Sequence, residues 1–245
     1  MKFTLPKPKL EAVFRLALLS GYHDKAELFG NSNSLYINDN QAVHILTYAK
    51  FEQSYGFTDL NLERPVVLTP TLATALKSFD CKNVTLNSNT DTVTLDCGSW
   101  HYEENAQQPT NNKFDFEIQE LTGSVKALAP ANVSFKFGFS VEKSELSKIP
   151  SSPDYTFISK DNGLSIEMEH LGKMNVKLNC IGVLEQNTDY RGSIFGAEFQ
   201  NSLKNFEEGE MGLVCGDNFI ILSQQTPDKK IMIALALQAL GNIVV

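Results

Sequence analysis

The order of the predicted helices and strands constrains the fold of this chain more than any single motif. Alternating and β-rich patterns predict strands along most of the 245 residues, whereas apolar residues at helical spacing predict only four helices. The order strand, helix, several strands, helix, several strands occurs before about residue 120 and again after about residue 134. In both copies the two helices are roughly sixty residues apart. The sequence therefore predicts two copies of one α+β module, a repeat of architecture rather than of sequence.

Apolar stripes and boundary residues place the four helices. The first has apolar residues at i, i+3, i+4, i+7 and i+8, with Pro8 placed to open the helix and Gly21 to close it. The second follows Pro70, the third covers about Glu142–Ile149, and the fourth lies within 196–209. The predicted strands, with hairpin turns at 88–91 and 161–163, are Tyr36–Tyr48, Val84–Leu86, Thr92–Asp96, Lys113–Glu120, Ser134–Val141, Leu164–His170 and Met174–Ile181.

The segment between the two copies differs from both in composition. Residues 121–133, LTGSVKALAPANV, are small and mildly apolar and include Pro130, which indicates a connector. We therefore expect an N-terminal domain over 1–120, the connector over 121–133 and a C-terminal domain over 134–245.

The charge balance restricts how this chain could bind nucleic acid. The net charge of −8 argues against such a function unless the basic residues are segregated onto one face. Any one exposed lysine is more often an ordinary solvated residue. If the four helices share one surface, however, their basic residues would hold phosphates there without reading bases. These residues are Lys7, Lys9, Arg15, Lys77, Lys143, Lys148 and Lys204.

The cysteines and the apolar stretches indicate a cytoplasmic protein. The four cysteines are scattered, without a Cys-x-x-Cys pair or a histidine at zinc-ligand spacing, so we expect buried, reduced thiols. The first twenty residues do not resemble a signal peptide. The longest apolar stretch, Ile231–Leu240, is too short to cross a bilayer, so no membrane partner is expected.

Motifs that carry catalysis are missing from the sequence. It contains no Gly-rich phosphate loop, no Gly-x-Ser-x-Gly and no His-Glu-x-x-His, and the four histidines share no metal-binding spacing. We therefore expect a binding protein without cofactor or metal, not an enzyme.

Several segments resemble those of the DNA sliding clamps, that is, proliferating cell nuclear antigen and the T4-type phage processivity clamps. The resemblance covers nearly the whole chain, and its clearest segments are SFKFGFSVEKSELSKI, DNGLSIEMEHLGKMNVKLN, AEFQNSLKNFEEGEMGLVCGDNFIILSQQ, KKIMIALALQ and, in the first copy, KFDFEIQEL. The few basic residues of the short third helix and the apolar end at 242–245 favour a viral member, such as one from a bacteriophage.

The resemblance implies a fold, an assembly and partners. Each module would carry two helices on antiparallel sheets, and the chains would close into a ring, expected to be a homotrimer, with the basic helices around duplex DNA. The sequence does not distinguish a trimer from a dimer ring. A DNA polymerase and a clamp loader would be its protein partners. Edge strand 113–121 of one copy would pair with edge strand 173–181 of the next. The charged interface residues would be Lys113, Asp115, Glu117, Lys173 and Lys177.

The resemblance also implies a pocket for short partner peptides beside the connector. The matching residues are Val43, His44, Ile45, Val125, Leu128, Leu235 and Leu237. Plain core packing explains the apolar ones equally well.

Two other functions stay open at this point. A viral β-rich structural or receptor-binding protein would suit the strand-rich body with Trp100 and Tyr102, but a pure sandwich would lack the two pairs of helices. A β-rich glycosidase is the more distant possibility, because nothing in the sequence selects a pair of carboxylates.

Overall fold

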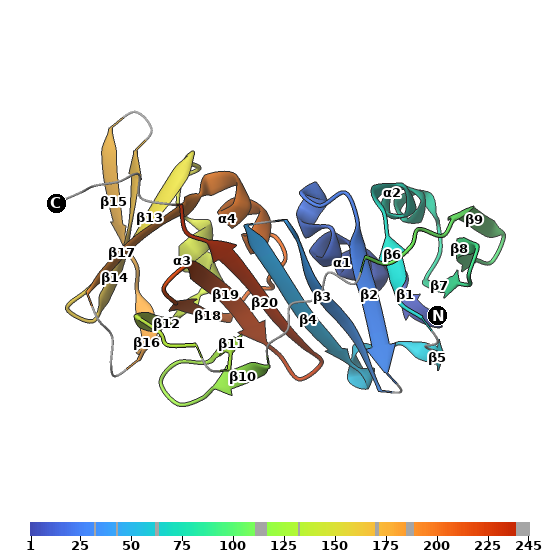
Figure 1. Cartoon of the computed structure of the whole chain (residues 1–245), viewed down its shortest axis with the longest axis horizontal. Coiled ribbons are helices and arrows are strands. Elements are labelled where there is room, and N and C mark those ends of the chain that lie inside the picture. Colours follow the sequence, from blue (N-terminus) through green and yellow to red (C-terminus); the bar gives the residue numbers. More distant parts are fainter. Residues whose placement is uncertain are drawn as a thin grey trace. The chain divides into compact units, whose positions relative to one another are not determined.

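A computed structural model describes residues 1–31, 33–42, 44–61, 64–110, 117–131, 133–169, 172–184 and 189–238 (Figure 1). The chain divides into two compact units. The first unit comprises Met1–Ala42, Thr47–Phe114 and Thr226–Lys230, and the second comprises Val43–Leu46, Asp115–Gln225 and Ile231–Val245. The predicted domain limits at 120 and 133 stay a prediction.

The first unit has two α-helices packed on antiparallel strands. Its elements are β1 (Lys2–Pro6), α1 (Lys7–Ala17), the 3-10 helix η1 (Leu19–Gly21), β2 (Ala26–Asn31), β3 (Ser34–Ala42), β4 (Ile45–Glu52), the 3-10 helix η2 (Gln53–Tyr55), β5 (Thr58–Asn61), β6 (Val66–Leu68), α2 (Pro70–Ser78), β7 (Asn83–Ser88), β8 (Thr92–Cys97) and β9 (Trp100–Asn105). Its strands follow the orders β5-β1-β7-β8-β9 and β4-β3-β2-β6.

The second unit repeats this arrangement strand for strand. Its elements are β10 (Ile118–Leu121), β11 (Ala127–Pro130), β12 (Phe137–Glu142), α3 (Lys143–Ser147), β13 (Asp154–Lys160), β14 (Gly163–Glu169), β15 (Lys173–Lys177), β16 (Cys180–Val183), β17 (Tyr190–Phe195), α4 (Gly196–Leu203), β18 (Glu210–Cys215), β19 (Phe219–Gln225) and β20 (Lys229–Ala236). The orders β16-β12-β18-β19-β20 and β15-β14-β13-β17 match those of the first unit, and β10 and β11 form an additional hairpin. The predicted α+β fold with a doubled module is therefore confirmed.

The helices form where the apolar stripes predict them. In α1 the stripe residues Leu10, Val13 and Phe14 are buried. α2 begins after Thr69, whose hydroxyl accepts a hydrogen bond from the Leu72 amide at 3.2 Å and so caps the helix. α3 and α4 end earlier than predicted, at residues 147 and 203.

Two strand predictions are wrong because each predicted strand contains a break that no glycine or proline marks. The segment predicted as one strand over 36–48 is two strands, β3 and β4, and the one predicted over 174–181 is divided between β15 and β16 in different sheets. The turn predicted at 161–163 is confirmed, with Asp161 and Asn162 at φ of 51° and 57° between β13 and β14.

The prediction of four reduced cysteines is wrong for one pair. Cys81 and Cys97, with Cα atoms 6.4 Å apart, form a disulfide. The β7–β8 hairpin brings them together, because Cys81 lies just before β7 and Cys97 ends β8. Cys180 and Cys215 are free, and burial raises the pKa of the Cys215 thiol to about 12.

Candidate nucleic-acid interface

In each unit the two α-helices contact one another and pack on the strands beside them. α1 contacts α2, β1 and β7 in the first unit, and α3 contacts α4 and β12 in the second. Because the apolar stripe of each helix faces inward, the seven predicted basic residues lie on or near the opposite faces. Their contacts divide them into two groups.

Three of the seven basic side chains are exposed and form no ion pair with an acid in the described part of the chain. Arg15 near the end of α1 and Lys77 near the end of α2 are exposed and form no side-chain hydrogen bond or ion pair with another described residue. Lys204, just after α4, is exposed and donates only to the amide oxygen of Asn201, at 2.9 Å. These three are free to contact phosphate groups.

The other four basic side chains are engaged within their own unit. Lys7 donates to the carbonyls of Phe79 and Lys77 after α2, and Lys9 donates to the Tyr55 carbonyl at 2.7 Å. The ammonium groups of Lys143 and Lys148 lie 2.8 Å and 2.7 Å from carboxylates, those of Glu208 and Glu145. The Lys148 ammonium also lowers the pKa of Glu145.

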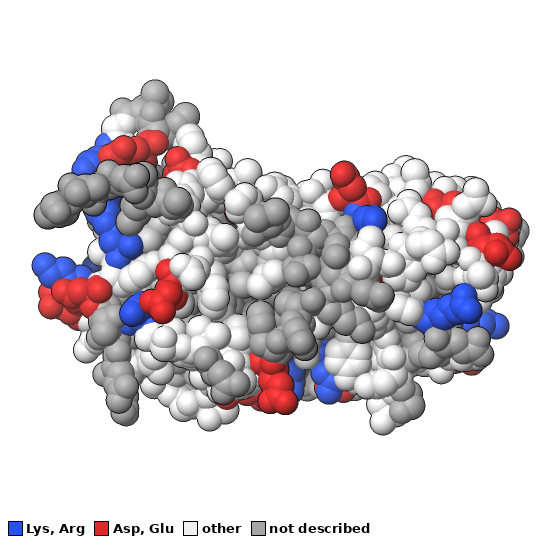
Figure 2. All heavy atoms as spheres, in the orientation of Figure 1, with Lys and Arg blue, Asp and Glu red and all other residues white. Residues whose placement is uncertain are grey.

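The surface charge is mixed rather than segregated on the side drawn in Figure 2. Lys and Arg side chains lie beside Asp and Glu side chains in several small groups among the described residues of that face. Among the described residues, eight of the 21 Lys and Arg side chains form ion pairs with acids. Of the seven basic residues predicted on or beside the helices, Arg15, Lys77 and Lys204 are exposed and form no ion pair with a described acid.

The structure places the predicted interface residues unevenly. Lys113 and Asp115 lie outside the described residues, and Glu117 is exposed just before β10. β10 pairs with β11, so the described part of strand 113–121 is not an edge of the five-stranded sheet. Lys173 and Lys177 are exposed on β15, which is the outer strand of its sheet, as predicted.

β9 is an outer strand that the sequence pattern did not predict. It ends the order β5-β1-β7-β8-β9 and exposes 45% of Trp100, which stacks on Phe79 at 5.9 Å between ring centroids. β15 exposes 50% of Met174 in the same way. Large apolar side chains are also exposed on the outer strands β16, at Ile181 (58%), and β17, at Phe195 (44%). The alternation of aromatic and polar residues at the start of Trp100–Asn105, WHYEEN, could have predicted β9.

Most of the predicted pocket residues are in the core. Ile45, Leu128 and Leu235 are fully buried. Val125 is 2% exposed. The burial of these four residues agrees with core packing, the alternative to a peptide pocket that the sequence allowed equally. Val43 lies outside the described residues.

An exposed patch remains beside the buried pocket positions, all within the second unit. The exposed ring of His44 lies edge-on to Phe195, with 6.3 Å between centroids. Phe195 is 44% exposed, and Leu237 is partly exposed while its amide donates to the Asn218 carbonyl at 2.8 Å. We call His44, Phe195 and Leu237 the aromatic patch.

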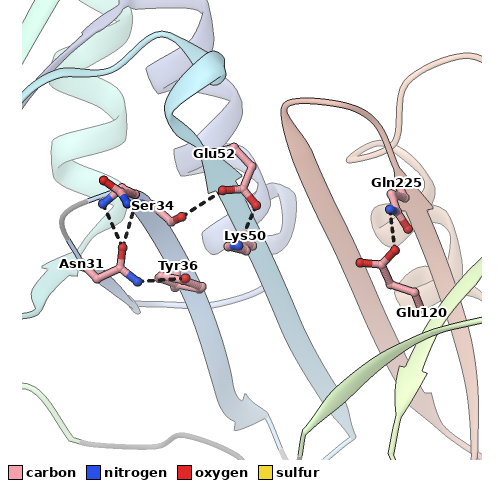
Figure 3. A network of polar contacts seen from close by, with 8 residues as sticks. Asn31, Ser34, Tyr36, Lys50, Glu52, Glu120 and Gln225 are labelled. Carbon is pink, nitrogen blue, oxygen red and sulfur yellow. Dashed lines mark hydrogen bonds and ion pairs between the residues drawn. The ribbon is translucent and has the colours of Figure 1, made fainter.

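A polar network on β2, β3 and β4 of the first unit is structural (Figure 3). Glu52 accepts a hydrogen bond from Ser34 at 3.0 Å and lies 2.6 Å from the Lys50 ammonium, which lowers the pKa of Glu52 and raises that of Lys50. Asn31 accepts from the Ser34 amide and donates to the Tyr36 hydroxyl, both at 3.0 Å. Each acid and base here has a partner, so the network fixes the β2–β3 turn rather than activating a nucleophile.

Figure 3 also shows a smaller contact in the second unit. The Gln225 amide donates to Glu120 at 2.8 Å and ties β10 to β19. Within the described ranges no group of three or more His, Cys, Asp or Glu side chains could hold a metal ion. None of the helices described is long and apolar enough to cross a membrane.

Comparison with known proteins gives structural matches only. No protein-family model and no curated protein sequence matches the chain. A structure of A. fulgidus PCNA with the C-terminal region of FEN-1 bound matches with a TM-score of 0.74 and 14% identity, over 98% of this chain and 99% of that one. The Thermococcus kodakaraensis PCNA matches with a TM-score of 0.72 and 13% identity, over 97% and 99%.

A eukaryotic structure gives the same result. The PCNA of Entamoeba histolytica matches with a TM-score of 0.72 and 14% identity, over 97% of this chain and 98% of that one. At such identities the likeness concerns the fold and not the individual residues. Because the doubled module and nearly the full length are matched, the chain has the fold of the DNA sliding clamps.

Proposed function

We propose that this protein is a DNA polymerase processivity factor, a ring of identical chains that encircles duplex DNA and tethers the polymerase. The observation that supports this most is the doubled module, which is matched over nearly the whole chain by PCNA structures. The paired helices with exposed bases and the outer strands β9 and β15 give independent support. The protein acts as a scaffold and not as an enzyme.

The strand order supports ring closure through β9 and β15. β9 ends the five-stranded order of the first unit, and β15 ends the four-stranded order of the second. In the repeat, β9 is the counterpart of β20, and β15 is the counterpart of β4. We therefore infer that β9 of one copy pairs with β15 of the next, in place of the predicted strand 113–121.

The side chains on these two strands suit such a pairing. Exposed Glu103 on β9 has the opposite charge to exposed Lys173 and Lys177 on β15, which favours pairing between the strands over self-pairing. Pairing would also bury Trp100 and Met174. Because one chain carries one strand of each kind, the contact is head-to-tail. Such a contact closes a ring when the rotation between copies closes, and we propose that it does so in a homotrimer.

Arg15, Lys77 and Lys204 would contact the DNA backbone inside the ring. Such contacts are electrostatic and blind to sequence, and their small number keeps binding weak enough for sliding. The other four lysines would add to the positive electrostatic potential inside the ring. Each must give up its internal hydrogen-bond or ion-pair partner before it contacts a phosphate. These are Lys7, Lys9, Lys143 and Lys148.

The aromatic patch is the proposed docking surface for a polymerase and a clamp loader. The A. fulgidus PCNA structure has the C-terminal region of FEN-1 bound, which supports this proposal. An exposed aromatic ring beside a partly exposed leucine suits an apolar anchor of such a segment. The source we propose is viral, and the place of action is the cytoplasm where that DNA is replicated.

Primer extension with the polymerase and clamp loader from the same source tests this function. We expect product length on a long primed template to rise at least about tenfold when the protein is added with the loader and ATP. Omitting the loader on circular DNA is the control, since a closed ring then cannot be loaded. Equal product length with and without the protein would contradict the proposal.

A further inference from the structure

Within the predicted connector (121–133), residues Ser124–Leu128 are docked on a sheet face of their own unit. Val125, Ala127 and Leu128 are at most 4% exposed, whereas Ser124 and Lys126 are exposed. β11, which begins within this segment, contacts β18 and β19. The connector is therefore a seated segment with one face turned into the unit.

Four small residues on neighbouring strands lie beneath the connector. The register pairs Gly182 with Ser140, Ser140 with Gly212, and Gly212 with Ser223. They form one row across β16, β12, β18 and β19, and both serines are fully buried. We call this row the connector seat.

The serines of the seat bind the connector backbone. The Ser140 hydroxyl accepts a hydrogen bond from the Lys126 amide, and the Ser223 hydroxyl accepts one from the Leu128 amide, each at 2.9 Å. Ser124 completes the docking by donating its hydroxyl hydrogen to the Val183 carbonyl at 2.7 Å. Alternate amides of the connector are thus satisfied by side chains of the sheet rather than by a neighbouring strand.

The glycines of the seat make room for the connector. A Cβ atom on Gly182 would lie 1.5 Å from the Ser124 carbonyl oxygen. One on Gly212 would lie 2.3 Å from the Ala127 Cβ and 2.6 Å from the Lys126 carbonyl oxygen. Any side chain at either position would displace the connector or distort the sheet.

We propose that the connector seat is a positioning site for partner binding. It holds the connector in one place, so that a partner peptide meets Ser124 and Lys126 while Val125 and Leu128 stay in the core. This inference rests on the proposed function, because it assumes that partners dock beside the connector. The four seat residues act through the connector and touch no partner themselves.

Two kinds of variant of the full chain test the seat. Gly212→Ala adds volume, and Ser140→Ala with Ser223→Ala removes both acceptors without adding volume. In either we expect the Lys126 and Leu128 amides to exchange hydrogen about tenfold faster, and polymerase stimulation to fall several-fold. The ring mass from light scattering should not change. Gly163→Ala is the matched control, because it adds the same methyl group in the second unit, where its Cβ would meet only the Lys160 carbonyl oxygen, at 3.3 Å, and no connector residue.

The readouts separate the possible failures. Unchanged amide exchange in both variants would show that the row does not hold the connector. Faster exchange with unchanged polymerase stimulation would overturn the positioning role. If the native protein itself does not stimulate the polymerase, the proposed function fails, and with it the partner-binding role, while amide exchange still decides whether the row holds the connector.

Discussion

The two units use the same sheet face in opposite ways. In the second unit the row Gly182, Ser140, Gly212, Ser223 is covered by the connector. The corresponding row of the first unit is Thr58, Thr4, Thr85 and Asp96, which the register joins in the same order of strands. Thr4 and Ser140 correspond because each lies three residues before the first residue of its helix, Lys7 or Lys143.

Side-chain size and polarity account for the difference. The hydroxyls of Thr4 and Thr85 bond to one another at 2.8 Å, and Thr94 donates to Asp96 at 3.1 Å, so this face satisfies its own polar groups. Its Thr58 is exposed, whereas both glycines of the second row are buried. One backbone arrangement therefore gives a solvated face or a docking face according to four residues.

The two units also differ in their outer strands, and we expect a substitution there to have the largest effect on assembly. β15 of the second unit has no described partner on its outer side. Met174→Asp would place a charge in the proposed subunit contact and raise the dissociation constant of the ring by on the order of a hundredfold. Light scattering at micromolar concentration should then give the mass of one chain instead of three.

Tyr22→Asp is the control for that substitution. Tyr22 is 42% exposed but lies in the loop after α1 and not on an outer strand. The interface assignment is wrong if both variants keep the native mass.

The second difference between the units is the disulfide of the first. Cys97→Ser should lower the free energy of unfolding by about 2–4 kcal/mol in oxidising buffer, because the cross-link no longer restricts the unfolded chain. Urea unfolding followed with and without a reductant measures this change. Cys180→Ser in the second unit, at a free thiol, should unfold as the native protein does. If reductant does not change the urea midpoint of the native protein, the disulfide does not contribute to its stability.

The third difference lies in the basic residues of the helices. Arg15→Gln with Lys77→Gln in the first unit should reduce retention on DNA about fivefold at 0.15 M salt, because these charges are free to neutralise phosphates. Lys143→Gln with Lys148→Gln in the second unit should reduce it about twofold or less, since these lysines already have carboxylate partners. Equal losses in the two pairs would show that the internal ion pairs do not matter.

The smallest expected effect concerns acid sensitivity. His23 of the first unit is 4% exposed, and neither ring nitrogen has a described hydrogen-bond partner. Burial lowers its pKa below the ordinary value of about 6.5, so the stability it contributes is present above that pH and is lost as the pH falls. His23→Leu should flatten the decline in thermal midpoint below pH 6.5, and an unchanged decline would contradict this.

The pKa of His101, also in the first unit, is shifted in the opposite direction. Its hydrogen bond to Asp96, at 2.6 Å, raises its pKa. Its contribution is therefore present at low pH and lost as the pH rises. His101→Gln should leave the acid decline caused by His23 in place.

Local patterns were sufficient to predict the helices and the hairpin turns. The stripe through Leu10, Val13 and Phe14 fixes the buried face of α1, and the Asp161-Asn162 turn fixes the β13–β14 register. The division of 36–48 into two strands was missed because Val43 and His44 carry no turn signal.

Features that depend on distant residues could not be predicted. The Cys81–Cys97 pair requires the β7–β8 register, and the burial of Leu128 requires the sheet beneath it. Whether Lys7 or Lys77 is free depends on which carbonyls lie nearby in the fold. The sequence therefore predicted which helices carry the candidate site. It could not predict which basic side chains are free of internal partners and so available to contact DNA.

Retention on circular and linear DNA tests the proposed ring most directly. The protein is loaded onto nicked circular DNA with its clamp loader, washed in high salt, and measured before and after one restriction cut. A closed ring should stay on the circle through the wash and leave rapidly once the DNA has free ends. Equal retention on circular and linear DNA would contradict encirclement and with it the proposed function.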